Sequence, residues 1–260
     1  MEHLFPVIGA GTWWETNLTA VGMSVVVALI VLLLARLAVA NLDVRKPRGM
    51  QNFFEWVVDF ITGLAKDTIG GERAKTYVPL AFTLIIYLFC ANQIGLITNL
   101  NFDLHEPGFG VNPTAFHEAE AKSGHASVSL FMSPTANLSI AMAMSIGIVG
   151  MTHIIGLRNP GSYFKHYFQP NPAFFILHVI DEGAKFLTLG LRLFGNIFAG
   201  EVLIAILLGI PLIGGWFPVG AVPMVVWIAY SLFVGTIQAF VFTVLTLVYI
   251  SQKLPHEQHH

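Results

Sequence analysis

The 260-residue chain is 55% hydrophobic, and only 11% of its residues are Asp, Glu, Lys or Arg, against about 25% in soluble domains. This composition excludes an ordinary soluble protein, because too few charged side chains are present to cover its surface. The formal net charge of -2 shows no nucleic-acid footprint, and the single cysteine, Cys90, excludes an internal disulfide. We therefore expect an integral membrane protein.

Five apolar segments are long enough to cross a bilayer, which takes about 20 helical residues. They lack the alternating pattern of membrane β-strands, and a helix satisfies all of its backbone polar groups within lipid. The sequence therefore predicts an all-α fold and a single membrane domain over residues 1–260. The expected spans are roughly residues 18–42, 77–100, 134–157, 172–210 and 218–250.

Residues 51–69 follow a different pattern, with apolar side chains at helical spacing on one face and Glu55, Asp59, Thr62 and Lys66 on the other. This segment is too polar to span, so we predict an amphipathic helix on the cytoplasmic membrane surface. An amphipathic helix packed on another subunit is the alternative, and both can hold at once.

Lys and Arg in the connections predict the orientation, because they concentrate on the cytoplasmic side of membrane proteins. Only Lys122 falls on the side of the N-terminus. The opposite side carries nine: Arg45, Lys46, Arg48, Lys66, Arg73, Lys75, Arg158, Lys165 and Lys253. The N-terminus is therefore expected outside and the C-terminus in the cytoplasm.

The fourth and fifth spans are longer than a bilayer is thick. Roughly 35 helical residues reach about 50 Å, against about 30 Å of hydrocarbon. Such helices must tilt strongly or protrude, so we predict a slanted pair of long antiparallel helices.

Charged residues within the fourth span are costly at membrane depth and by default mark a function. The alternative is a structural ion pair or a side chain that reaches back to the surface, and it applies best near the cytoplasmic end. The polar residues of this span are His178, Asp181, Glu182, Lys185, Arg192, Asn196 and Glu201.

Helical geometry separates these residues into two groups. Arg192 and Asn196 are four residues apart and share a face, and Lys185 lies on nearly the same stripe. Glu201 is nine residues after Arg192 and lies about half a turn round the helix. A polar stripe towards the cytoplasm and a carboxylate towards the outside suit two aqueous paths, each crossing only part of the membrane.

The fifth span carries a stripe of Ser231, Gln238, Leu245, Tyr249 and Gln252. In an antiparallel pair of helices, Gln238 is expected at the depth of Arg192, and its buried amide needs partners. The alternative is an interhelical hydrogen bond that only holds the helices together.

The runs LGLRLFGNIFAGE (residues 189–201), IQAFVFTVLTLVYIS (237–251) and FCANQIGLITN (89–99) closely resemble subunit a of the bacterial F-type ATP synthase membrane sector. The predicted topology agrees with that family, and the resemblance covers most of the chain. It implies a non-catalytic stator subunit with two offset half-channels, which deliver protons to and from the carboxylates of a rotating ring of c subunits.

The resemblance also implies residue roles. Arg192 matches the arginine that faces the c-ring, Asn196 and Glu201 match residues of the outer half-channel, and Gln238 matches the glutamine near the arginine. The segment DEGAK resembles the cytoplasmic half-channel, to which we assign His178, Asp181, Glu182 and Lys185. Ser231 departs from the family pattern, in which histidine or a carboxylate is frequent, so a proton-relay role for it is not implied.

The implied partners are the c-ring, the b-subunit stalk, other ATP synthase subunits, membrane lipid and protons, with no nucleic acid. The implied location is the bacterial plasma membrane, and no cofactor is expected. No nucleotide motif occurs, so the chain is not expected to hydrolyse or make ATP by itself.

We expect the outer connection to be a solvated hairpin. The alternative is a metal site, but no tight ligand spacing supports one. The candidate ligands are His105, Glu106, His117, Glu118, Glu120 and His125.

Two other functions are possible for the whole chain. A self-contained proton channel would show similar half-channels, whereas an ion-coupled secondary transporter would show inverted repeats, which this sequence lacks.

Overall fold

The computed structural model describes residues 4–9, 12, 15–40, 42–43, 49–97, 100–104, 110–123, 126–168, 174–210 and 220–254. Within these residues, five helices are long and apolar enough to cross a membrane. They are α1 (Leu18–Val39), α3 (Ala74–Ile97), α5 (Leu138–Gly156), α7 (Phe174–Leu208) and α8 (Ala221–Lys253). The predicted class, a helical membrane protein with five spans, is confirmed.

Two spans differ from the predicted ones at the ends that flank residues 101–133. The second was expected to reach residue 100, but α3 ends at Ile97 and Leu100 begins a strand. The third was expected to begin at residue 134, but a short 3-10 helix, η1 (Pro134–Ala136), precedes α5. Asn137 separates the two, because its side chain accepts hydrogen bonds from the first backbone amides of α5. Residues 172, 173, 218 and 219 of the expected spans lie outside the described residues.

Short strands add two antiparallel hairpins to the predicted helices. One pairs β1 (Val7–Ile8) with β2 (Thr16–Asn17). The other pairs β3 (Leu100–Leu104) with β4 (Ala126–Phe131). A polar helix, α4 (Pro113–Ser123), lies in the chain between the strands of the second pair.

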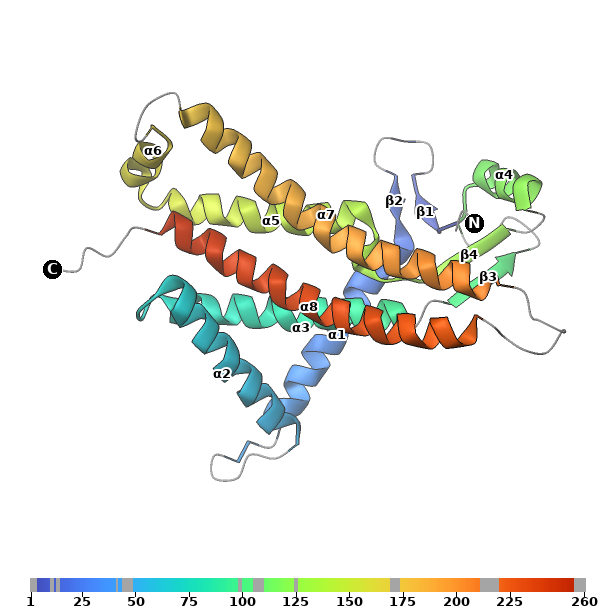
Figure 1. Cartoon of the computed structure of the whole chain (residues 1–260), viewed down its shortest axis with the longest axis horizontal. Helices are drawn as coiled ribbons and strands as arrows, with labels where there is room; N and C mark the ends of the chain where they lie inside the picture. The colour runs from blue at the N-terminus through green and yellow to red at the C-terminus, as the bar shows by residue number, and fades with distance from the viewer. Residues whose placement is uncertain are drawn as a thin grey trace.

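Four of the long helices lie side by side with their axes in a similar direction: α3, α5, α7 and α8 (Figure 1). Fully buried apolar side chains from all four meet in the main core, including Leu88, Ala141, Leu189 and Phe242. The β3–β4 hairpin marks one end of this group, which we call the hairpin end. A short helix, α6 (Pro160–Phe168), marks the other, where α5 and α8 finish and α7 starts; we call it the α6 end.

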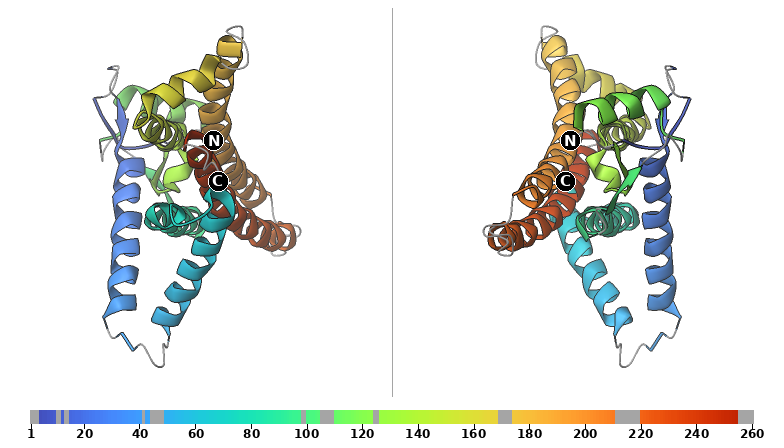
Figure 2. Two further views of the ribbon diagram at one scale, coloured as in Figure 1. Left: turned by 90° about the vertical axis from the view of Figure 1, so that its left-hand side faces the viewer. Right: turned by 90° about the vertical axis from the view of Figure 1, so that its right-hand side faces the viewer.

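The fifth long helix, α1, crosses the direction of the other four steeply (Figures 1 and 2). Its 22 residues reach about 33 Å, enough for an upright crossing of a bilayer. The 35 residues of α7 and the 33 of α8 reach about 50 Å. If α1 crosses the membrane upright, α7 and α8 must be strongly tilted. Their extra length is what such a tilt requires.

The amphipathic helix forms as α2 (Met50–Ile69), almost over the predicted range. Its Val57, Ile61 and Ala65 are buried against α3 and α8. Beside this face, Trp56 and Phe60 are exposed and stack on each other, and the ring of Phe60 also lies 6.0 Å from that of Phe240 on α8. The helix thus buries one face within the chain and leaves an aromatic face for lipid or another subunit.

Close contact between α5 and α7 depends on Gly190. A Cβ atom at this position would lie 2.5 Å from Met142 Sδ and 3.3 Å from Ser145 Cβ, both on α5. The Ser145 hydroxyl also donates to the backbone carbonyl of Phe186 on α7. Small residues at helix contacts let membrane helices approach closely, and this contact sets which face of α7 turns inward.

Candidate functional site

Arg192 lies on α7 at the border between its buried and exposed faces and is half-buried. Within the described part of the chain, no carboxylate or hydrogen-bond acceptor pairs with its guanidinium. Its neighbour on α8 is Tyr249, which lies close enough for electrostatic interaction with it. The ring centre of Tyr249 is also 5.7 Å from Lys185 Nζ, so this phenol lies near both cations.

Asn196, one turn after Arg192 on α7, pairs with Gln238 of α8. Asn196 Nδ2 donates to Gln238 Oε1 over 2.7 Å, joining α7 to α8. Asn196 is exposed, whereas Gln238 is buried. Gln238 Nε2 is one of three buried side-chain polar atoms without a partner within the described residues. Gln238 therefore contacts α7 one turn after Arg192.

Glu201 meets the hairpin-end segment that precedes α5. Its Oε1 accepts a hydrogen bond from the backbone N–H of Ser133 over 3.3 Å. Ser133 Oγ donates to the Ala91 carbonyl over 3.0 Å and lies 2.7 Å from Thr135 Oγ1. The Thr135 hydroxyl in turn donates to Asn92 Oδ1 over 2.8 Å. A chain of buried polar groups therefore runs from Glu201 on α7 to α3.

This polar chain continues from α3 to α8. Asn92 is fully buried, and its Nδ2 donates to the Gly235 carbonyl over 2.9 Å. Gly235 permits the contact, because a Cβ there would lie 3.3 Å from Asn92 Cβ. Gln93 Nε2 donates to Leu232 O and Thr236 Oγ1, each over 3.0 Å. The sequence had marked this part of α3 only through the family resemblance, with no role for its side chains.

Ser231 is buried beside Gly200, where a Cβ would lie 3.5 Å from the Ser231 hydroxyl oxygen. That hydroxyl has no partner within the described residues. It therefore lies on the side of α8 that faces α7 without joining the chain of bonds that begins at Glu201.

At the α6 end, the acidic and basic residues of α7 pair with one another and with α8. Lys185 Nζ lies 2.9 Å from Asp181 Oδ2 and 3.1 Å from Glu182 Oε1. Lys253, near the end of α8, donates to the same Glu182 Oε1 over 2.5 Å. The structural alternative, an ion-pair group, is thus present here, and it includes Lys253, which sequence reasoning had used only for orientation.

Aromatic residues of α6 complete this group. His153 of α5 lies with Nε2 at 3.5 Å from Glu182 Oε2 and Nδ1 at 2.7 Å from the Tyr163 hydroxyl, so it bridges α7 and α6. The rings of Tyr167 and His178 pack edge to face at 5.9 Å between centres. No local pattern could have found Tyr163 or Tyr167, because both belong to a short helix outside the spans.

The polar groups at the two ends of α7 are well separated, with Arg192 near the midpoint. Ten residues separate Glu182 from Arg192 and nine separate Arg192 from Glu201. At about 1.5 Å per residue, the arginine lies about 15 Å and about 14 Å from these carboxylates along the axis. One helix therefore carries an acidic group at each end and an unpaired cation between them.

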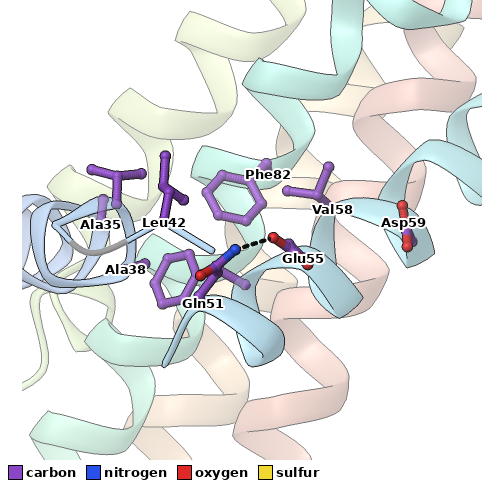
Figure 3. A pocket seen from close by; sticks show the side chains of 10 residues that line it. Ala35, Ala38, Leu42, Gln51, Glu55, Val58, Asp59 and Phe82 are labelled. Carbon is purple, nitrogen blue, oxygen red and sulfur yellow. Dashed lines mark hydrogen bonds between the residues drawn. The ribbon is translucent and has the colours of Figure 1, made fainter. Parts of the chain in front are cut away.

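A separate cleft of about 460 Å³ opens between α1, α2 and α3, away from Arg192 (Figure 3). Its walls are mostly apolar, with Phe82 of α3 and Val58 of α2 among them, and Glu55 and Asp59 also line it. Gln51 Nε2 donates to Glu55 Oε1 over 2.7 Å within the cleft. It contains none of the predicted site residues.

Metal ligands do not gather in the described ranges, where no three His, Cys, Asp or Glu side chains come close enough to hold an ion. His117 lies 3.7 Å from Glu120 on the exposed helix α4. Three of the candidate ligands, His105, Glu106 and His125, lie outside the described residues.

Comparison with known proteins gives a consistent result. The family model described as ATP synthase A chain matches residues 21–251. An ATP synthase subunit a of Bacillus pumilus is 39% identical over 252 residues, covering 93% of each chain. Subunits of the same name from Anoxybacillus flavithermus and Listeria monocytogenes are 37% and 36% identical, covering 99% of this chain and 100% of theirs.

Proposed function

The chain belongs to the ATP synthase subunit a family, and from this premise we propose that it is the stator subunit that carries protons to and from a rotating ring of c subunits. The observation that carries the proposal is the absence of an anionic partner for Arg192 within the described part of the chain. A charge at membrane depth is retained when it is paired or functional. The missing partner is then a carboxylate of another subunit.

The guanidinium does two things in this proposal. It favours the ionised form of a carboxylate that approaches it, so a c-subunit carboxyl gives up its proton as it reaches Arg192. An arginine side chain also keeps its own protons under physiological conditions. Arg192 therefore cannot pass a proton from one half-channel to the other, and it prevents leakage between them.

The two half-channels are proposed to follow the polar groups at the ends of α7. Glu201, with Asn196 and Gln238 beside the arginine, belongs to the outer path. His178, Asp181, Glu182 and Lys185 belong to the cytoplasmic path. Each proton that crosses releases about 2.3 kcal/mol per 100 mV, and rotation of the ring transfers this energy to catalytic subunits elsewhere.

The exposed face of α7 next to Arg192 suits a helical partner. Leu191, Phe198 and Val202 are exposed there, as expected for a surface that meets lipid or apolar helices. Gly195 lies one turn from Arg192, and a Cβ at this position would meet no atom of the described residues within 4 Å beyond the local backbone of α7. A partner helix can therefore come close to the backbone beside the arginine.

The proposed setting is a multi-pass protein of the bacterial plasma membrane, with the α6 end in the cytoplasm and the hairpin end outside. The nine-to-one distribution of connecting Lys and Arg residues supports this orientation. The b-subunit stalk and other ATP synthase subunits are the further proposed partners. The chain has no catalytic role of its own in this proposal.

The test is Arg192→Ala in the assembled complex, reconstituted in vesicles. Arg36→Ala, an exposed arginine on α1, is the matched control. We expect Arg192→Ala to abolish proton-driven ATP synthesis and ATP-driven pumping while the subunits still purify together, and Arg36→Ala to leave both rates unchanged. Normal pumping by Arg192→Ala would reject the proposal, and proton flux from the purified chain without a ring would favour the self-contained channel.

A further inference from the structure

A closed ring of polar contacts joins four helices at the α6 end (Figure 1). Lys253 Nζ donates to Glu182 Oε1 and, over 3.0 Å, to the Tyr167 hydroxyl. The Tyr167 and Tyr163 hydroxyls are 3.2 Å apart, and Tyr163 lies 2.7 Å from His153 Nδ1. His153 Nε2 then faces Glu182 Oε2 at 3.5 Å. The two oxygens of Glu182 thus have different neighbours, ammonium groups at one and the imidazole at the other.

The hydrogen position on neutral His153 follows from its neighbour on α7. An ionised carboxylate can only accept, so Glu182 Oε2 favours the tautomer that carries the hydrogen on Nε2. In that tautomer Nδ1 accepts from the Tyr163 hydroxyl. The Tyr167 hydroxyl accepts from Lys253, and the bond between the two tyrosine hydroxyls can run in either direction.

The ion-pair group beside His153 has no net charge. Asp181, Glu182 and Lys185 of α7 and Lys253 of α8 carry two negative and two positive charges. Among the other described groups nearby, Tyr163 and Tyr167 of α6 are neutral, because burial raises the pKa of Tyr163 to about 12 and raises the pKa of Tyr167 as well. His178 of α7 packs against the ring of Tyr167. A histidine is the side chain that ordinarily gains and loses a proton near neutral pH.

His153 is also better placed for exchange with solvent than the fixed charges of its ring. Its side chain is 29% exposed, against 14% for Glu182 and 4% for Lys253. A phenol hydroxyl donates to a neutral imidazole and accepts from an imidazolium. Tyr163 can therefore keep its bond to His153 in both protonation states by rotating its hydroxyl.

We propose that His153 is the residue that takes up and releases protons at the mouth of the half-channel at the α6 end, with Tyr163 and Glu182 as its positioning residues. This inference rests on the proposed function. In the synthesis direction, a proton released from the c-ring binds the lone pair of Nδ1, and the Tyr163 hydroxyl turns from donor to acceptor. The imidazolium then loses the Nδ1 proton to water, and the Tyr163 hydroxyl turns back to donor, so the neutral tautomer with its hydrogen on Nε2 is restored.

The test measures passive proton flux through vesicles that hold the assembled complex with its catalytic sector removed, between about pH 5.5 and about pH 8.5, the range in which histidine titrates. We expect His153→Gln to lower the flux about tenfold and to abolish its change with pH across this range. His153→Ala should lose flux similarly and regain it when imidazole is added, because the small molecule can occupy the vacated space. His117→Gln, on the exposed helix α4, should behave as wild type.

Assembly is followed in the same samples as the amount of catalytic sector that rebinds. Unchanged flux and pH profile in His153→Gln would overturn the inference, and so would a loss of flux in His153→Ala that imidazole does not reverse. Failure of both variants to assemble would show a purely structural ring and would also overturn it. Arg192→Ala is measured alongside to separate the two proposals. If Arg192→Ala stops the proton flux while His153→Gln leaves it unchanged, the inference about His153 fails and the proposed function stands.

Discussion

Asn196 donates its side-chain amide to Gln238 over 2.7 Å, one turn of α7 beyond Arg192. The bond links an exposed residue on α7 to a buried residue on α8. It therefore fixes the two longest helices in register beside the arginine, at the surface where the c-ring is proposed to pass.

The coupling between Asn196 and Gln238 can be measured with a double-mutant cycle. Gln238→Leu keeps a similar volume but cannot accept the hydrogen bond, and Asn196→Ala removes the donor. Polar pairs between membrane helices are worth about 0.6 kcal/mol and at most about 1.7 kcal/mol, so we expect a coupling energy in this range in the free energy of unfolding. Reversible unfolding in mixed detergent micelles would measure it, and strictly additive variants would show that the bond does not form.

The same pair should affect transport through the register of the helices. We expect Gln238→Leu to lower ATP-driven proton pumping several-fold, about 1 kcal/mol at the barrier, while the subunits still purify together. Pumping at the wild-type rate would show that the hydrogen bond only holds the helices together.

Gly195→Leu tests the surface next to Arg192. Among the described residues, no atom outside the local backbone of α7 lies within 4 Å of a Cβ at Gly195, so the variant chain should fold and insert normally. A leucine there would hold a partner helix away from Arg192, and we expect little or no pumping and weaker retention of the c-ring during purification.

Gly147→Leu is the matched control for this surface, because Gly147 on α5 is also exposed and has nothing within 4 Å of its Cβ. It should retain both pumping and the ring. Equal behaviour of the two leucine variants would contradict a ring contact at Gly195.

Glu201→Gln tests the carboxylate of the outer path. The amide oxygen of glutamine can still accept from the Ser133 N–H, but the side chain no longer exchanges a proton. We expect proton flux to fall about tenfold, less than in Arg192→Ala, because other polar groups and water remain along the path. Flux assays in vesicles would measure this, with Glu118→Gln on the exposed helix α4 as the control. A complete loss of flux, equal to that in Arg192→Ala, would contradict the smaller effect expected for Glu201→Gln.

Several features followed directly from the sequence. The five spans, the amphipathic helix and the over-long last pair were predicted from local hydrophobic pattern, because a membrane imposes length and apolar composition on each helix separately. Arg192 stood out for the same reason, since a charge in an apolar run is costly wherever the helix packs. The β3–β4 hairpin was not predicted as strands, because short polar strands leave no comparable periodic signal.

Only the tertiary structure decided which of these residues meet. Glu182 pairs with Lys253, 71 residues away, and Glu201 accepts from a backbone amide at Ser133, 68 residues away. Such contacts depend on helix crossing and register, which follow from close approaches such as Gly190 against Met142. Local periodicity describes one helix at a time, so it could not show whether another helix brings an opposite charge to Arg192. The packed helices show that α3, α5 and α8 bring none within the described residues.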